Sequence, residues 1–165
     1  MPPRIDLSAF ECSVARTLDV VGDKWTLLVI RDAFYGVRRF EDFTRDLGIA
    51  RNVLTDRLGR LVDAGILERQ LYQDRPPRYE YRLTRKGRDL LPVLVTLMRW
   101  GDTWAPHGDE PPVDLVHRDC GNATHAVVSC AHCGDDLTPF NIRMEPLPPT
   151  IREIVDERRA QRTPH

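Results

Sequence analysis

The stretch RFEDFTRDLGIARNVLTDRLGRLVDAG, residues 39–65, decides the fold of this 165-residue chain. Phe40, Phe43 and Leu47 recur at the spacing of one helix face, and Gly48 follows them as a C-cap. A turn of three or four residues then leads into a second helix with one apolar side. That side is formed by Leu54, Leu58, Leu61 and Val62. Two short helices joined by such a turn make a helix-turn-helix unit.

Two more helices are predicted before this unit. Apolar residues at helical spacing indicate a short helix from about Ala9, with Ser8 as its N-cap. The segment Lys24–Phe34 is apolar around most of its circumference. A helix of that kind is expected at the centre of a core. We therefore expect this segment to be the central buried helix.

A hairpin and a long helix are predicted after the unit. Residues 66–72 and 78–83 alternate in polarity as strands do, and the turn between them contains two prolines that no helix would cross. Thr84 then caps a long helix with a wide apolar stripe that ends near Trp104. The expected fold class is mainly α with a small β-hairpin wing, which is a winged helix-turn-helix.

Composition divides the chain into a main domain and a tail. Eight of the thirteen prolines lie after residue 105, and residues 106–116 read as a linker. We expect a winged-helix domain at 1–105, a small zinc-ribbon-like module at 117–143, and a tail at 144–165 with a short helix that Thr150 caps.

Charge is distributed in the same way. The chain has a net charge of −1, which by itself argues against a strongly basic nucleic-acid binder. Residues 38–88, however, carry 13 basic and 8 acidic side chains, whereas residues 106–165 carry 6 and 10. A basic segment thus precedes an acidic tail, and the basic segment suits DNA.

The first hundred residues resemble the HxlR-type winged-helix transcription regulators. The matching positions are, in order, Cys12, Gly22-Asp23-Lys24-Trp25-Thr26-Leu27-Leu28, Arg39-Phe40, Gly48-Ile49, Leu54-Thr55-Asp56-Arg57-Leu58, Gly65-Ile66-Leu67, Pro77-Arg78-Tyr79-Glu80-Tyr81, Leu83-Thr84 and Gly87. The resemblance implies a homodimeric DNA-binding regulator, usually a repressor. Two positions depart from the family pattern: Ser13 stands where proline is common, and Asp23 where a second glycine is common.

The second helix of the unit is predicted to read the major groove with its first turn. Arg51 suits guanine and Asn52 suits adenine. Asp56 either accepts from cytosine or orients Arg60, four residues further on. The alternative for this whole face is a solvated surface without a ligand. The predicted DNA-binding residues are Arg39, Arg51, Asn52, Thr55, Asp56, Arg57, Arg60, Arg75 and Arg78.

The hairpin and the long helix indicate how DNA would be held. Arg75 and Arg78 flank the two prolines of the hairpin tip, and a stiff basic tip suits the minor groove or its phosphates. A single winged helix covers too few base pairs for useful specificity, so we expect a homodimer on a palindromic double-stranded site. Trp100 and Trp104 are the expected dimer surface; the alternative is that both cap the monomer's own core.

Two kinds of signal are considered. Some members of the family sense oxidants or electrophiles through a cysteine at the position that Cys12 matches, and the alternative is a buried, inert thiol. A small-molecule effector would need a pocket, which we place between the long helix and Trp25.

The remaining cysteines form a metal-binding pattern. His117-Arg118-Asp119-Cys120-Gly121 and Cys130-Ala131-His132-Cys133-Gly134 share the arrangement of ligand, two residues, cysteine and glycine. His117, Cys120, Cys130 and Cys133 would give zinc a closed tetrahedral site with a structural role. His125 or His132 is an alternative to His117, and a free dithiol in a ribbon without metal is another.

No pattern of an enzyme is found. The chain lacks a phosphate-binding loop, a nucleophile elbow and the motifs of zinc hydrolases and deaminases. Its longest aliphatic run is Leu27–Ile30, too short to span a membrane, so we expect no membrane contact and a cytoplasmic protein. The expected function is a sequence-specific, DNA-binding transcription regulator. The alternative is a protein-binding winged-helix module that no longer binds DNA.

Overall fold

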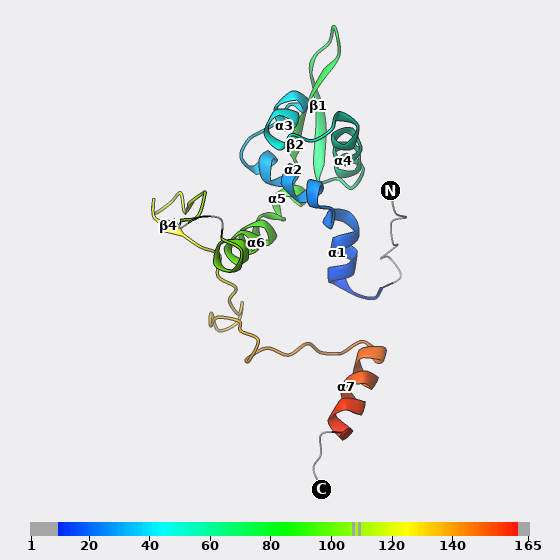
Figure 1. Cartoon of the computed structure of the whole chain (residues 1–165), viewed down its shortest axis with the longest axis vertical. Helices are drawn as coiled ribbons and strands as arrows, with labels where there is room; N and C mark the ends of the chain where they lie inside the picture. Colours follow the sequence, from blue (N-terminus) through cyan, green and yellow to red (C-terminus); the bar gives the residue numbers. More distant parts are fainter. Residues whose placement is uncertain (1–9, 107, 109, 162–165) are drawn as a thin grey trace. The chain divides into compact units, whose positions relative to one another are not determined.

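The computed structural model describes residues 10–106, 108 and 110–161 (Figure 1). The chain divides into two compact units, residues 1–126 and residues 127–165, and each is considered by itself. The helices of the first unit are α1 (Ser13–Val21), α2 (Lys24–Phe34), α3 (Phe40–Leu47), α4 (Arg51–Asp63), α5 (Arg85–Arg88) and α6 (Leu91–Trp104). Its strands are β1 (Leu67–Gln73), β2 (Arg78–Leu83), β3 (Leu115–Val116) and β4 (Ala123–Thr124).

The core surrounds α2, as its apolar circumference predicts. Val29 and Ile30 of α2 are completely buried, and so are Phe43 of α3 and Leu54 of α4. Gly48 ends α3 at a φ of +58°, a left-handed conformation that glycine adopts without steric cost. The predicted helix-turn-helix unit is therefore present, and it is fixed to the rest of the fold by its buried faces.

The predicted wing is an antiparallel hairpin of β1 and β2. Leu67 pairs with Leu83 at its base, and the register shifts between Leu71 and Gln73 near its tip. The Tyr81 N–H donates to the carbonyl oxygen of Arg38 at 2.8 Å, so the segment before α3 lies along β2. Figure 1 shows the hairpin extending beyond α3 and α4. The wing is thus attached to the helix-turn-helix unit at its base and free at its tip.

The helices at the two ends of the winged domain differ from the prediction. α1 begins at Ser13, because residues 10–12 are not helical; the predicted N-cap Ser8 lies outside the described residues. The single helix predicted from Thr84 to Trp104 is interrupted between α5 and α6. Pro92 explains the interruption, since it has no N–H to continue the hydrogen-bonding of α5 and fits the first turn of a new helix.

The cap at the start of α5 is as predicted, because the Thr84 hydroxyl accepts from the Gly87 N–H at 3.1 Å. A side chain at Gly87 would place its Cβ 2.2 Å from the carbonyl oxygen of Ile66. Glycine is therefore needed where α5 crosses the start of the wing.

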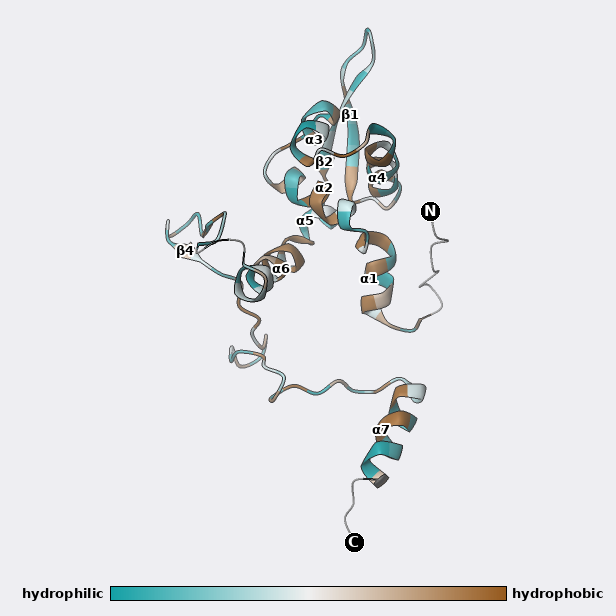
Figure 2. Cartoon of the chain, viewed as in Figure 1, coloured by the Kyte–Doolittle hydropathy of each residue, from teal (hydrophilic) through white to brown (hydrophobic). Residues whose placement is uncertain are grey.

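Apolar side chains remain exposed on α1 and α6. None of the residues of α6 is buried, and the exposed fractions of Trp100 and Trp104 are 61% and 72%. On α1, Val14 and Leu18 are also exposed. Figure 2 shows both helices with hydrophobic ribbon, whereas the wing is largely hydrophilic. The alternative that the two tryptophans cap the monomer's own core is therefore wrong.

Two short strands and one further helix follow α6 in the part of the chain that the structure describes. β3 and β4 pair as a short antiparallel hairpin and belong to the first unit, so the compact units divide after Ala126, inside the module expected at 117–143. The second unit contains α7 (Pro149–Gln161), which begins one residue before the predicted cap Thr150. Within residues 10–106, 108 and 110–161, no helix is long and apolar enough to cross a membrane.

Candidate nucleic-acid interface

The first turn of α4 presents its polar side chains to solvent. Arg51, Asn52 and Thr55 are exposed, while Leu54 and Leu58 of the same helix face the core. The Thr55 hydroxyl donates to the carbonyl oxygen of Arg51 at 2.8 Å and is thereby held close to the helix. The first turn of α4 itself contains no acidic residue.

Arg51 is held at this position by residues of α3. Its guanidinium carbon lies 4.8 Å from the centre of the Phe40 ring, and its Nη2 lies 3.8 Å from Glu41 Oε1. Stacking on the ring restricts the side chain without using its hydrogen-bond donors. Arg51 therefore remains free to donate to a ligand in front of α4.

Asp56 and Arg60 form an ion pair on the next turn. Asp56 Oδ2 is 2.9 Å from Arg60 Nε and also accepts from Arg57 Nη1 at 2.8 Å. Of the two roles considered for Asp56, this geometry is that of orienting Arg60. Both side chains are about half exposed, so Arg60 can still approach DNA with its remaining donors.

Arg57 requires a correction, because it is buried. Its side chain is 7% exposed, and its Nε lies 3.0 Å from Asp23 Oδ1. Asp23 also caps α2, accepting from the Trp25 N–H at 2.9 Å. The departure from the family pattern at Asp23 thus supplies both a helix cap and the partner of a buried guanidinium. Arg57 stabilises the packing of α4 on α2 and has no surface to offer DNA.

The other arginines predicted to bind DNA lie on the wing or contact it. Arg75 and Arg78 are exposed at the hairpin tip. Arg39, at the N-cap of α3, stacks over the Tyr72 ring at 4.5 Å and lies 3.3 Å from Glu80 Oε1. Arg82 and Arg39 together lower the pKa of Glu80, with the hydrogen bond from Arg82 the largest cause. Arg39 therefore helps to fix the wing, whereas Arg75 and Arg78 have no ion pair with any residue that the structure describes.

Cys12 is exposed and stands at the N-cap of α1. The backbone N–H groups of Ala15 and Val14 lower the pKa of its thiol, because they stabilise the thiolate at the start of the helix. Helical spacing predicted a helix start near Ala9, which would have put Cys12 inside the helix and away from these N–H groups. The alternative of a buried thiol is wrong.

The first predicted metal-binding segment forms a tight turn. The Gly121 N–H donates to the carbonyl oxygen of His117 at 2.8 Å, and the His117 N–H donates to that of Asn122 at 3.0 Å. His117 Nδ1 lies 3.4 Å from Cys120 Sγ. Hydrogen bonding from Asn122 lowers the pKa of the Cys120 thiol. The turn brings the two proposed ligands of this segment together.

The second segment repeats this turn. The Gly134 N–H donates to the carbonyl oxygen of Cys130 and the Cys130 N–H to that of Asp135, both at 2.8 Å. Gly134 has a φ of +82° and Gly121 of +71°, which explains the glycine in both patterns. Hydrogen bonds from the backbone N–H groups of Cys133 and His132 lower the pKa of the Cys130 thiol.

The two segments belong to different units, so each is described alone. Within the part of the chain that the structure describes, no three His, Cys, Asp or Glu side chains are grouped so as to hold a metal ion. The donors in each turn nevertheless fit zinc, which takes thiolate and imidazole ligands.

The comparisons with known proteins agree with the fold. The model of the HxlR-like helix-turn-helix family matches residues 20–109. An HTH-type transcriptional regulator of Mycobacterium tuberculosis is 47% identical over 136 residues, which are 82% of this chain and 86% of that protein. The similarity to this relative covers 136 residues, more than the 109 residues up to the end of the family match. It therefore continues beyond residue 109.

Solved structures of transcription regulators are also similar to this chain. PA1607, a candidate transcription factor, has 40% identity and a TM-score of 0.75, covering 84% of this chain and 97% of that one. The redox regulator HypR in its reduced form has 36% identity and a TM-score of 0.53, covering 56% and 92%. The similar proteins are transcriptional regulators, and this chain is a member of the HxlR-like helix-turn-helix family.

Proposed function

We propose that this regulator binds a specific double-stranded DNA site and represses transcription from it as a homodimer. The observation that carries the proposal is the exposed first turn of α4, where Arg51 and Asn52 are open to solvent, as are Arg75 and Arg78 at the wing tip. Base-reading groups on one helix and charge-bearing groups on a flanking hairpin are what winged-helix readout of DNA requires.

Two variants separate the two kinds of contact. Arg75→Ala removes a charge at the wing tip, so DNA affinity falls similarly for all sequences and its salt dependence becomes shallower. Asn52→Ala removes a base contact, so preference relaxes at one base pair. Fluorescence anisotropy with duplexes at several salt concentrations measures both. Wild-type affinity in both variants would contradict the proposed docking and favour a module that binds another protein.

A second copy of the chain is the proposed partner of the apolar faces of α1 and α6. Trp100 and Trp104 expose large rings that a monomer leaves in water, and two copies present the same faces to each other. A pair of reading helices related by a two-fold axis fits a palindromic site. Trp104→Glu should give a monomer in light scattering, while Tyr35→Glu, which changes an exposed ring outside both helices, should not.

Cys12 is the proposed redox signal receiver. It is exposed, its pKa is lowered, and it begins one of the two helices of the proposed dimer surface. Oxidation with diamide would then join two copies through a disulfide, with both thiols losing hydrogen to the oxidant. Non-reducing electrophoresis of the wild type and of Cys12→Ser tests this, and a dimer band that persists in the variant assigns the reaction to another cysteine.

Zinc is the proposed resident ion of the segment 117–143, where His117, Cys120, Cys130 and Cys133 would hold it. The support is that both turns have the same hydrogen bonds and a left-handed glycine after the second ligand. Elemental analysis of protein purified without chelator should find about one zinc per chain. Replacing Cys130 with Ser should remove it, whereas Cys12→Ser should not, and a zinc content near zero in the wild type would reject the site.

A further inference from the structure

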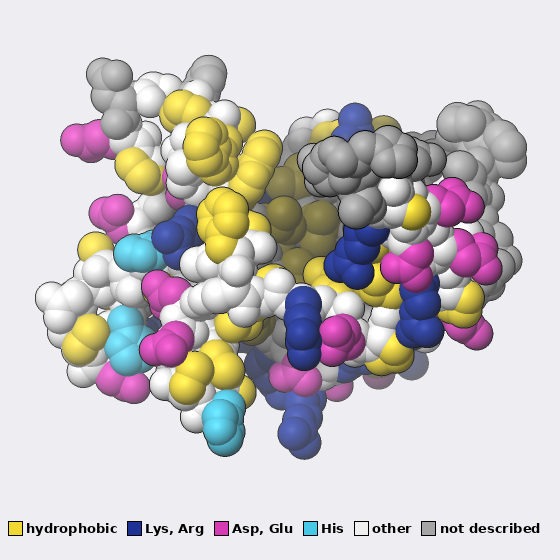
Figure 3. Space-filling view, turned by 90° about the horizontal axis from the view of Figure 1, so that it is seen from below, with side chains coloured by type: hydrophobic (Ala, Val, Ile, Leu, Met, Phe, Trp, Pro, Cys, Tyr) yellow, Lys and Arg dark blue, Asp and Glu magenta, His cyan; other side chains and the backbone are white. Residues whose placement is uncertain are grey.

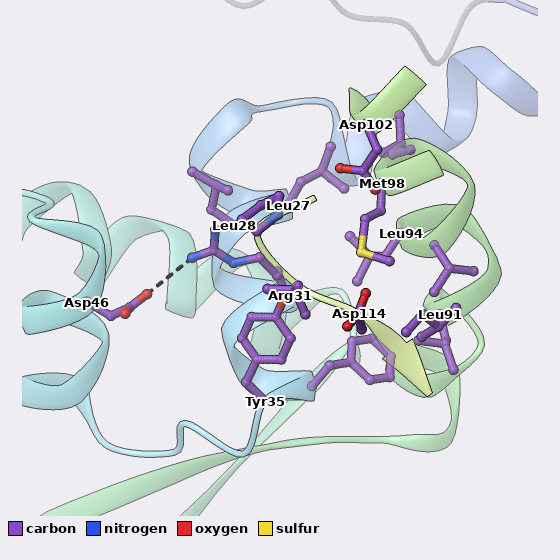
Figure 4. Close-up of a pocket in the computed structure, with 16 residues that line it drawn as sticks. Leu27, Leu28, Arg31, Tyr35, Asp46, Leu91, Leu94, Met98, Asp102 and Asp114 are labelled. Atoms are coloured by element: carbon purple, nitrogen blue, oxygen red, sulfur yellow. Dashed lines mark hydrogen bonds and ion pairs between the residues drawn. The ribbon is translucent and has the colours of Figure 1, made fainter. Parts of the chain in front are cut away.

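A cavity of about 680 Å³ lies in the first unit between α2 and α6 (Figure 4). Leu27 and Leu28 of α2 face Leu94 and Met98 of α6 across it, and residues 112–115 close a third side. This volume is within the range of small-molecule sites in proteins. The pocket was predicted between the long helix and Trp25; it lies instead beside Leu27 and Leu28 of α2.

Carboxylates outnumber cations in the wall of this cavity. Asp46, Asp102 and Asp114 line it, against the single guanidinium of Arg31. Arg31 is already used, since its Nη2 lies 2.6 Å from Asp32 Oδ1 and 3.1 Å from Asp46 Oδ2. The rest of the wall is almost entirely apolar, as Figure 4 shows.

Asp102 and Asp114 have no ion pair with any residue of the described ranges. They also line a neighbouring hollow of about 290 Å³ that contains Arg99. The Arg99 guanidinium, however, donates to the carbonyl oxygen of Ala126. Arg99 keeps its charge in that hollow but does not line the larger cavity, so Arg31 is the one cation in the cavity wall that the structure describes.

We propose that this cavity binds an organic cation with a bulky apolar body, and that the ligand is the effector of the regulator. The effector role rests on the proposed function; the binding does not. The apolar wall takes the body of the ligand, while Asp102 and Asp114 attract its charge. An organic anion of the same shape meets the same wall and is repelled.

The position of the cavity connects the two surfaces that a repressor uses. Asp46 belongs to α3 of the helix-turn-helix unit, and Arg31 ties it to α2. The opposite wall is α6, whose other face carries Trp100 and Trp104. A cation here competes with Arg31 for Asp46 and pushes on α6 at the same time. Binding in the cavity thus changes the geometry between DNA-reading and dimer helices.

Two ions of the same shape and opposite charge test the binding. Titration calorimetry of the full chain without DNA should show tetraphenylphosphonium binding and tetraphenylborate binding at least about tenfold more weakly, as the excess of carboxylates over cations in the wall predicts. Equal or tighter binding of tetraphenylborate overturns the proposal, and so does the absence of tetraphenylphosphonium binding.

Variants assign that binding to the cavity. Asp102→Asn together with Asp114→Asn should weaken tetraphenylphosphonium binding about tenfold and leave tetraphenylborate unaffected or improved. Asp63→Asn together with Asp74→Asn, an equal loss of charge at two exposed positions that do not line the cavity, should change neither. Met98→Trp fills the cavity and should weaken both ions. Unchanged phosphonium binding in the aspartate pair and in Met98→Trp places the ion elsewhere and overturns the proposal.

DNA affinity provides the separate readout of the effector role. Saturating tetraphenylphosphonium should change the affinity for DNA at least threefold in the wild type and not in the aspartate pair. If the chain binds the cation but no DNA, the proposed function fails and the cation site stands. If phosphonium affinity falls as the chain dimerises at higher concentration, a second copy covers the cavity and the effector proposal fails.

Discussion

The segment from α2 to β2 and the segment from α6 onward are stabilised in different ways. Among the described residues, the buried hydrophobic core consists of Val21 at the end of α1 and of residues between Val29 and Leu67, whereas α6 has no buried residue and Phe140 is 97% exposed. The face in Figure 3 shows hydrophobic side chains exposed among charged ones. The first segment therefore has a buried core of its own, whereas the second leaves apolar side chains exposed that the proposed partner, ion and ligand would cover.

The largest expected effect is a loss of stability, and two phenylalanine-to-alanine substitutions, one in each segment, measure it. Phe43→Ala should lower the free energy of unfolding by about 3–5 kcal/mol, because it empties a filled site in the core. Phe140→Ala should change it by less than about 0.5 kcal/mol. Urea denaturation followed by circular dichroism measures both, and Phe43→Leu gives a graded point if the alanine variant unfolds. A large cost at Phe140 would show that the tail packs as the first segment does.

A medium effect is expected from Arg57. Arg57→Ala leaves Asp23 and Asp56 without their shared cation, so the free energy of unfolding should fall by about 2 kcal/mol. Arg78→Ala, at the exposed wing tip, should leave stability unchanged and weaken DNA binding. Chemical denaturation and DNA anisotropy of both variants separate the roles. Normal stability with lost DNA binding in Arg57→Ala would return this residue to the DNA interface.

The smallest effect concerns the pH dependence of the first segment. Burial raises the pKa of the Asp32 carboxyl above its usual range, and nearby Asp46 adds to this while Arg31 opposes it. The folded state then holds the proton more tightly than the unfolded one. Stability is gained below the raised pKa and lost as pH rises through it. Asp32→Asn should flatten the dependence of the denaturation midpoint on pH above the ordinary carboxyl pKa of about 4; an unchanged slope would assign the dependence to another group.

Local patterns predicted most of the fold. The helical spacing around residues 40–62, Gly48 as a C-cap, and the prolines of the wing turn act within a few residues, so they survive in any surroundings. Pro92 is also a local signal, since proline favours the first turn of a helix and thus the separate start of α6. The candidate site was predicted less well, since exposure depends on neighbours far along the chain.

The amino-acid sequence by itself determined the winged helix, the basic character of residues 38–88 and the two repeated turns of the tail. Only the tertiary structure decided which charges are available. Arg57 and Arg51 lie on the same helix, yet Asp23, 34 residues before Arg57, takes one of them into the interior. The cavity beside Asp102 likewise exists only because α2, α6 and residues 112–115 meet. A charge acquires its role from the partner that folding brings to it, and helical periodicity carries no information about that partner.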